Sequence, residues 1–158
     1  MDLSEHFTLE EATVSQTAAR QGIDNSHPPQ EVIDAAIKTA TRIEKVRALL
    51  GAPIHVTSWI RTPALNIAIG SKTTSQHLKG EAVDFICPTY GDPAAICKLL
   101  VANADLIRYD QLILEHTWVH ISWNSIPNAI QRGQVLSLIK DGAYAAGLTD
   151  KFGTPLTS

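Results

Sequence analysis

The amino-acid sequence predicts an α+β domain whose small, mainly antiparallel sheet packs on N-terminal helices. Helical spacing of apolar residues dominates the chain up to residue 50, and short β-branched segments separated by tight reversals cluster after residue 54. The chain has 158 residues, a length that suits one hydrophobic core. We therefore expect residues 1–158 to form a single domain.

Helical patterns open the chain. Thr8 with Glu11, and Thr13 with Gln16, have the spacing of a capping box, so they predict two short helices. Apolar residues then recur at helical spacing over 29–50, which predicts a long amphipathic helix that packs on the core.

Strand patterns follow and are interrupted by two shorter helices. The strands are expected over 54–59, 82–86, 111–114, 119–123 and 134–139, and the helices over 64–69 and 93–103. Beyond Tyr144 the pattern fades, so we expect a loosely held C-terminal tail.

Composition argues against several classes of protein. The net charge is −3 and no block of Lys or Arg stands out, so we expect no nucleic-acid or membrane partner, and a monomer. The acidic N-terminus lacks an apolar stretch, so no signal peptide is expected. Cys87 and Cys97 are expected to be buried thiols, although a single disulfide bond stays open.

Three side chains from distant segments form a candidate metal site. Asp84 alternates with Val83 along its strand, so the two side chains point to opposite faces of the sheet. By the same alternation His120 projects from the face of Asp84, and His77 enters the Asp84 strand across a bend that Gly80 permits. Two imidazoles and one carboxylate suit Zn²⁺ with a fourth position open to water. Taken singly, such an Asp in a strand is usually a hydrogen-bonded edge residue and such a His is usually a polar surface residue.

The segments that contain these three residues resemble motifs of one known protein family. Residues 75–84, SQHLKGEAVD, match the S-x-H-x-x-G-x-A-x-D motif of the zinc D-alanyl-D-alanine carboxypeptidase family, which includes phage endolysins and vancomycin-resistance dipeptidases. Residues 118–122, WVHIS, resemble its second motif, and residues 56–66, VTSWIRTPALN, resemble its arginine-bearing segment. The opening FTLEE, residues 7–11, is similar to a branch common in phage and prophage genomes. The resemblance covers about residues 7–140.

The resemblance implies a fold shared with the Hedgehog signalling domain and one Zn²⁺ per chain, bound by His77, Asp84 and His120. It also implies hydrolysis of peptidoglycan peptide bonds flanked by D-amino acids. Both D-Ala-D-Ala trimming and cleavage of L-Ala-D-Glu or cross-bridge bonds stay open. A phage or prophage lysis enzyme of this kind would reach the wall after release through a holin-type partner or from a virion. Arg61 would hold substrate or the developing oxyanion, and otherwise it is a surface cation.

Strand register decides which residue accepts the proton of the attacking water. Many relatives carry an acidic residue three positions before the last histidine, but here that position is Thr117. A two-residue turn after Glu115 places this carboxylate opposite Trp118 on the His120 face, whereas a three-residue turn points it into the core. An unpaired buried carboxylate is costly, so we expect the first register and Glu115 as the general base. The alternative for Glu115 is a solvated strand end.

Three further residues have more than one interpretation. His116 is the fallback general acid or oxyanion stabiliser. Ser75 either touches substrate or caps its own loop, and Trp118 is expected to line the substrate groove. Because Thr117 departs from the family pattern, the alternative function is a zinc-bound, non-catalytic module that binds peptidoglycan or protein.

Overall fold

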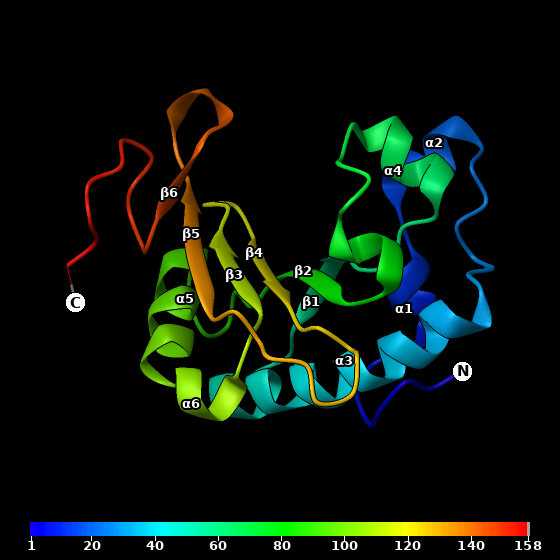
Figure 1. The fold of residues 1–158 in the computed structure, drawn as a ribbon, viewed down its shortest axis with the longest axis horizontal. Helices are drawn as coiled ribbons and strands as arrows, with labels where there is room; N and C mark the ends of the chain where they lie inside the picture. The colour runs from blue at the N-terminus through cyan, green and yellow to red at the C-terminus, as the bar shows by residue number, and fades with distance from the viewer. Residues whose placement is uncertain (158) are drawn as a thin grey trace.

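The computed structural model describes residues 1–157, and Figure 1 shows the two chain ends at opposite ends of the long axis. Helices are concentrated in the first two thirds of the chain: α1 (Leu9–Thr13), α2 (Gln16–Gln21), α3 (Gln30–Leu50), α4 (Pro63–Ile69), α5 (Pro93–Ala102) and α6 (Ala104–Ile107). Two short 3₁₀ turns are η1 (Gln76–Lys79) and η2 (Lys140–Gly142). The strands are β1 (His55–Ser58), β2 (Ala82–Ile86), β3 (Gln111–Leu114), β4 (Val119–Ser122), β5 (Gln134–Leu138) and β6 (Tyr144–Ala146).

The strands form one mixed sheet with the order β1-β2-β4-β3-β5-β6. Every pair is antiparallel except β3 with β5, which run parallel. Strand β4 runs back along one side of β3, and the connection over residues 123–133 then brings the chain to the other side of β3. The predicted α+β class and the mainly antiparallel sheet are therefore confirmed.

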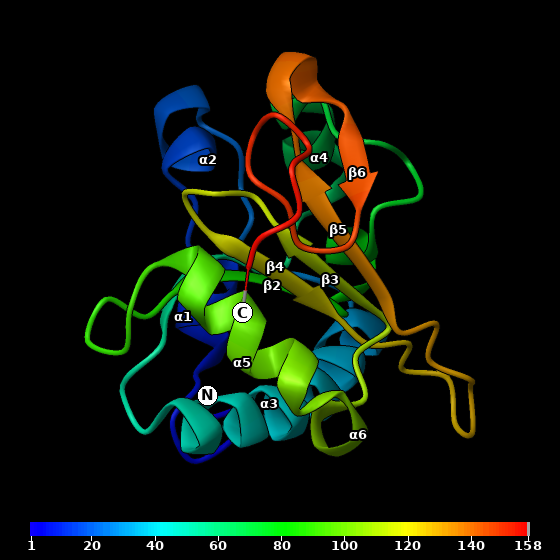
Figure 2. The same cartoon turned by 90° about the vertical axis from the view of Figure 1, so that its left-hand side faces the viewer.

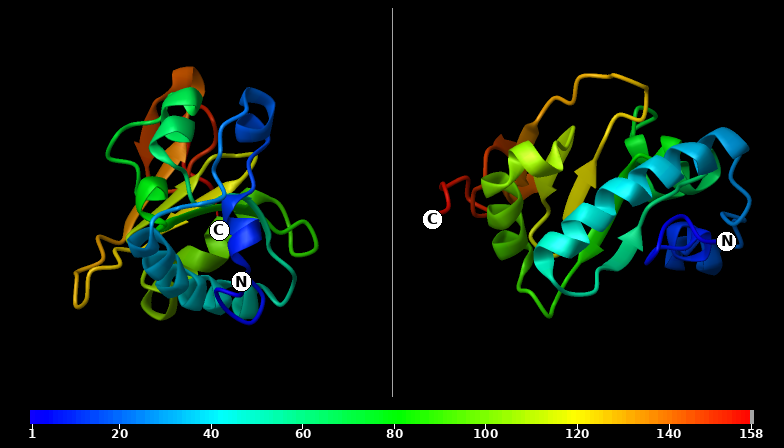
Figure 3. Two further views of the ribbon diagram at one scale, coloured as in Figure 1. Left: turned by 90° about the vertical axis from the view of Figure 1, so that its right-hand side faces the viewer. Right: turned by 90° about the horizontal axis from the view of Figure 1, so that it is seen from below.

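One face of the sheet is covered by helices. Val83 and Phe85 of β2, with Val119 and Ile121 of β4, are fully buried on this face. Ala40 of α3 belongs to the same core, and α3, α5 and α6 lie on one side of the strands in Figures 2 and 3. The opposite face of the sheet is left for polar side chains, as the alternation along the strands predicts.

The first two helices begin where side chains can satisfy free backbone N–H groups. Thr8 caps α1, because its hydroxyl accepts a hydrogen bond from the Glu11 amide at 3.1 Å. The expected cap at Thr13 is wrong, and Ser15 caps α2 instead. The Thr13 hydroxyl is already used inside α1, where it donates to the Leu9 carbonyl at 2.9 Å.

Two short elements had no recognisable pattern in the sequence. Helix α6 directly follows α5, and β6 pairs antiparallel with β5. The segment after Tyr144, for which a loosely held tail is expected, returns to the sheet edge, where the Thr149 amide donates to the Ser137 hydroxyl at 2.9 Å. Elements of three or four residues are too short to show a period, so tertiary contacts decide them.

The remaining composition-based expectations concern the cysteines and the membrane. Cys87 and Cys97 are both buried and unpaired, which confirms the thiol interpretation. Within residues 1–157, none of the helices combines the length and the apolar character needed to cross a membrane.

Candidate metal centre

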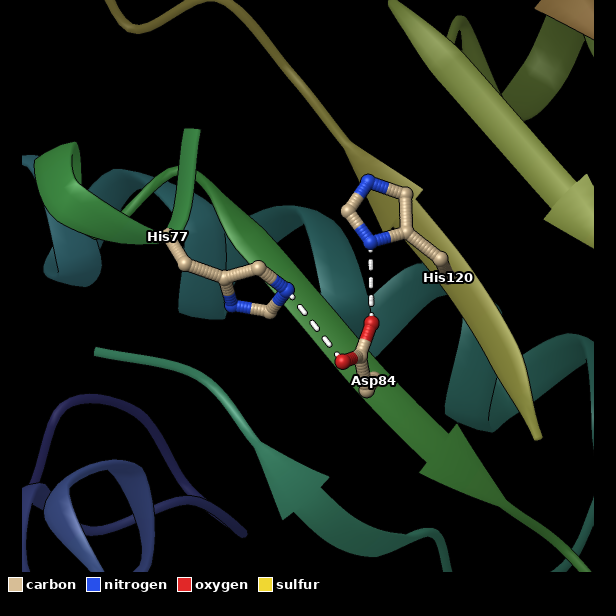
Figure 4. A group of neighbouring side chains, drawn as sticks. All are labelled: His77, Asp84 and His120. Carbon is tan, nitrogen blue, oxygen red and sulfur yellow. Dashed lines mark hydrogen bonds and ion pairs between the residues drawn. The ribbon is translucent and has the colours of Figure 1, made fainter. Parts of the chain in front are cut away.

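His77, Asp84 and His120 converge on the outer face of the sheet, as Figure 4 shows. Asp84 lies on β2 directly opposite His120 on the neighbouring β4, so strand pairing alone brings these two side chains together. His77 lies on η1, the turn that precedes β2. The bend between them depends on Gly80, which ends η1 with a left-handed φ of 74°.

The three side chains are close enough to share one ion. Their potential ligand atoms all lie within 4.8 Å of one another. His77 Nε2 is 3.3 Å from Asp84 Oδ2, and His120 Nδ1 is 2.9 Å from Asp84 Oδ1. The sequence-based prediction that these residues meet is therefore confirmed.

The orientation of His77 indicates that its Nε2 is a bare acceptor. His77 is only 2% exposed, and its Nδ1 lies 2.6 Å from the Trp59 carbonyl oxygen, so Nδ1 carries the proton and donates it there. Nε2 is buried and has no hydrogen-bond partner within the part of the chain that the structure describes. Burial also lowers the pKa of His77, which favours the neutral ring.

A bare imidazole nitrogen 3.3 Å from a carboxylate oxygen places two acceptors face to face. That contact is unfavourable unless a cation lies between them. The donor set of two imidazoles and one carboxylate, with one imidazole fixed by a backbone carbonyl, fits Zn²⁺. His77, Asp84 and His120 would hold the ion and leave one position for water or substrate.

The carboxylate of Asp84 is ionised. Burial by itself would raise its pKa, but the neighbouring histidines, among them His120 with its hydrogen bond, outweigh burial and hold the pKa of Asp84 well below its usual range. Arg61 adds a contact from the other side, because its guanidinium lies 3.3 Å from Asp84 Oδ2. The centre therefore presents the carboxylate of Asp84 between the two imidazoles and the guanidinium of Arg61.

The metal centre lies in a groove of about 850 Å³, here called the metal-centre groove. Its floor is the outer face of β2, β3 and β4, and one wall is formed by loop residues between Ile69 and Gln76. The opposite wall carries Trp118, Leu136 and Tyr144. A groove of this size, with apolar side chains on one wall and polar groups on the other wall and the floor, suits an extended peptide.

Arg61 is held in this groove by three contacts. Its backbone amide donates to the His77 carbonyl at 3.1 Å, and its Nε donates to the Ser58 hydroxyl at 3.2 Å. The third contact is the ion pair with Asp84. The side chain is 11% exposed, so the surface-cation interpretation of Arg61 is wrong. Burial lowers the pKa of Arg61, and the nearby charge of Asp84 opposes this change without cancelling it.

Glu115 takes the register that favours a role in the groove. Leu114 pairs with Val119, and the Glu115 amide donates to the Trp118 carbonyl at 3.2 Å, so only residues 116–117 form the turn. Glu115 therefore shares the face of His120 and lines the metal-centre groove. The Tyr144 hydroxyl lies 3.1 and 3.3 Å from the two carboxylate oxygens of Glu115. Burial raises the pKa of Glu115, and the Tyr144 hydrogen bond opposes that rise.

The structure separates the remaining candidates. His116 adopts a left-handed φ of 66° in the turn, and its Nε2 lies 2.8 Å from the Leu138 carbonyl oxygen. His116 is not among the described residues that line the metal-centre groove, so its role as a general acid or oxyanion stabiliser is not supported. Ser75 caps η1 by accepting from the His77 amide at 3.2 Å, and it also lines the groove with Trp118.

Sequence reasoning missed two groups that act on the site through other residues. The Trp59 carbonyl fixes the ring of His77, and Tyr144 binds Glu115. Every residue has a backbone carbonyl, so a sequence motif cannot indicate which carbonyl contacts a histidine. Tyr144 reaches the groove only because β6 pairs with β5, a contact that no local pattern indicates.

Comparison with known proteins identifies the matched segment. The family model described as Peptidase M15 matches residues 5–122. No curated protein sequence matches the chain. The matched range contains the three metal-site residues, Arg61 and Glu115, whereas Tyr144 lies beyond it.

Proposed function

The chain belongs to the peptidase M15 family, and from that premise we propose that it is a zinc peptidase that hydrolyses peptide bonds in bacterial peptidoglycan. The observation that carries the proposal is the buried His77 Nε2, which has no hydrogen-bond partner among residues 1–157, faces the Asp84 carboxylate and has His120 beside it. A Zn²⁺ held by these three residues would supply a Lewis acid that acidifies water and polarises the scissile carbonyl.

Glu115 is the proposed general base. Its carboxylate accepts a proton from the attacking water and returns it to the leaving amine. The register of β3 and β4 places Glu115 on the face of His120, and the Tyr144 hydroxyl contacts both carboxylate oxygens. These contacts hold the carboxylate at the metal-centre groove, which supports the role.

Arg61 is the proposed electrostatic partner of the oxyanion. Its guanidinium is mostly buried beside Asp84, on the groove wall next to the metal-site residues. A fixed cation in a site partly closed to water stabilises negative charge that develops on the substrate carbonyl.

The substrate would lie along the groove as an extended stem peptide. Trp118, Leu136 and Tyr144 offer apolar surface on one wall, and Lys72 and Ser75 offer polar groups on the other. Peptide bonds flanked by D-amino acids, in the stem or the cross-bridge, are the proposed targets. Mass spectrometry of the released muropeptides identifies the bond.

We also propose a biological setting, phage or prophage lysis by a monomeric single domain. Support comes from the phage-like opening at residues 7–11 and the resemblance across residues 7–140. Cytoplasmic expression with and without a membrane-permeabilising partner tests this setting. Lysis that depends on the partner supports it, and lysis without any partner contradicts it.

The catalytic proposal is tested by replacing Glu115 with its neutral isostere. Zinc-loaded Glu115→Gln protein should retain one Zn²⁺ per chain, because Glu115 is not one of the three proposed ligands. The release of amino groups from purified peptidoglycan should fall by about 100-fold or more, the usual contribution of a general base. His116→Asn is the matched control, since Asn tolerates the left-handed φ of this turn position and His116 lies outside the groove.

Three outcomes are informative. Activity near that of the unchanged protein in Glu115→Gln contradicts the assignment of the base. A large loss in His116→Asn with zinc retained would return that role to His116. If the unchanged protein binds one Zn²⁺ and peptidoglycan but releases no amino groups, the non-catalytic binding module is the correct function.

A further inference from the structure

A second groove lies on the helical side of the sheet, away from the metal centre. It has a volume of about 690 Å³ and runs between α3, the end of α6 and the connection from β4 to β5. Trp123, whose side chain points to the core face of β4, lies at its base. The groove is therefore built from the opposite face of the sheet to the one that carries His77 and Asp84.

Four cationic side chains line this groove, here called the basic groove: Lys38, Arg42, Lys45 and Arg108. No Asp or Glu is among its lining residues in the described part of the chain. None of the four cations forms an ion pair with a carboxylate among residues 1–157. In a chain whose net charge is −3, this is a local reversal of sign. A concave surface lined by one sign of charge concentrates ligands of the opposite sign.

Three of these cations form a row on one helix. Lys38, Arg42 and Lys45 are spaced four and three residues apart on α3, so they lie on one side of the helix. At 1.5 Å per residue they are separated along the axis by about 6 Å and about 4.5 Å. Arg108 at the end of α6 adds a fourth cation to the same groove. A linear row of cations complements a linear chain of anions better than a single anion.

The facing wall of the groove is preformed. In the connection from β4 to β5, the Asn124 amide donates to the Gln131 side chain at 2.8 Å, and Gln131 Nε2 donates back to the Asn124 carbonyl at 3.0 Å. Lys38 Nζ donates to the Ser125 carbonyl at 3.2 Å, which joins this wall to α3. The connection projects from the body of the molecule as the gold loop in Figure 2.

The same wall carries exposed aliphatic side chains. Ile126 is 65% exposed and Leu106, across the groove, is 54% exposed. Apolar surface next to a row of cations fits a ligand whose phosphates alternate with short carbon chains. A free inorganic phosphate would leave this apolar surface unused.

We propose that the basic groove binds a polyol-phosphate chain of the bacterial wall, a linear polymer of phosphodiesters joined by short carbohydrate or glycerol units. The cations contact successive phosphates, and Ile126 and Leu106 contact the carbon units. The choice of a wall polymer over other polyanions rests on the proposed peptidoglycan substrate. Binding would retain the enzyme on the wall through a face that leaves the metal-centre groove free.

The test uses the full chain and a purified glycerol-phosphate polymer as the probe. Binding is measured by fluorescence anisotropy at several salt concentrations. Four phosphate contacts predict a slope of log affinity against log salt of about −3. In Arg42→Gln/Lys45→Gln protein the affinity should fall by about tenfold or more and the slope should lose about half its value, about 1.5 units. Lys45→Gln/Arg108→Gln, which changes only exposed side chains, should give a similar loss and guards against a folding defect.

The matched control removes the same charge elsewhere on the surface. Arg20→Gln/Lys98→Gln replaces two exposed cations on α2 and α5 that do not line the basic groove, and it should bind the polymer like the unchanged protein. Because binding is measured without turnover, its failure is distinguishable from failure of the proposed peptidase activity. In the hydrolysis assay, the groove variants should lose activity on polymer-bearing walls and keep it on walls stripped of the polymer.

Several results overturn the proposal. These are no binding of the polymer, equal binding by the groove variants and the unchanged protein, or an equal loss in the control. Vesicles of anionic phospholipid and a single-stranded oligonucleotide serve as competing probes. If either binds more tightly than the polymer and its binding is lost in the groove variants, the site belongs to a membrane or a nucleic acid instead.

Discussion

Gly80 joins the metal site to the core, and its replacement by alanine gives the sharpest test of the fold around that site. Gly80 has a left-handed φ of 74°, and a Cβ built there lies 2.7 Å from the Val32 carbonyl oxygen of α3. The Gly80 carbonyl also accepts hydrogen bonds from Trp59 Nε1 at 3.0 Å and the Thr39 hydroxyl at 2.9 Å. The backbone therefore cannot move away from α3 without breaking these contacts.

The expected loss of stability has two parts. A left-handed alanine costs about 1–2 kcal/mol relative to glycine. Pressing a methyl group against a fixed backbone oxygen adds about 1–3 kcal/mol, the usual cost of overpacking. Gly80→Ala should therefore lower the free energy of unfolding by about 2–5 kcal/mol. Gly70→Ala is the matched control, because Gly70 has a φ of 79° with nothing within 4 Å of the added Cβ, so it should cost only the first part.

Urea denaturation of the two variants separates these parts. At an unchanged m-value, the difference between the two midpoints reports the steric cost alone. Zinc affinity should also fall in Gly80→Ala, because displacement of η1 moves His77, and it should stay unchanged in Gly70→Ala. Equal midpoints for the two variants would refute the reasoning, since they would show that α3 and η1 yield without cost.

Two further predictions concern the proposed base and the metal. Tyr144→Phe removes a hydrogen bond that lowers the pKa of Glu115, so this pKa should rise further. Because the base acts as a carboxylate, the acidic limb of the pH profile of kcat/KM should move to higher pH, with little change on the plateau. An acidic limb at an unchanged pH contradicts the positioning role of Tyr144. Removing zinc should destabilise the protein: at a metal concentration 100 times Kd the lost binding free energy is about 2.7 kcal/mol, or about 5–11 °C in Tm for a chain of this size. Calorimetry with and without chelator measures the shift, which should vanish in Asp84→Asn, and a chelator-independent Tm in the unchanged protein argues against a bound ion.

Much of the site could be predicted because its parts are local in sequence. The alternation of Val83 with Asp84 set the face of the carboxylate, and turn length set the face of Glu115. Both follow from the two-residue period of a strand, which any sequence displays directly. The family motif then added which histidines belong together, something that spacing could not show.

The predictions that went wrong failed for equally specific reasons. Thr13 has the spacing of a cap, but its hydroxyl bonds back into α1 and Ser15 caps α2 instead. The loosely held tail expected after Tyr144 missed the contacts that return this segment to the sheet, such as the one from the Thr149 amide to the Ser137 hydroxyl. In each case contacts that the local pattern does not show decided the structure.

By itself the sequence determined the types of the longer elements and the outward face of the polar strand residues, because those features repeat over short distances along the chain. The motifs it shares with a known family indicated which three side chains meet at the metal centre. Only the tertiary structure decided that the Trp59 carbonyl fixes His77 and that Tyr144 reaches Glu115 from β6. It also decided that cations from α3 and α6, with no charge block in the sequence, line one groove. These contacts join segments far apart in the chain, so they depend on strand order and helix packing, which local patterns do not encode.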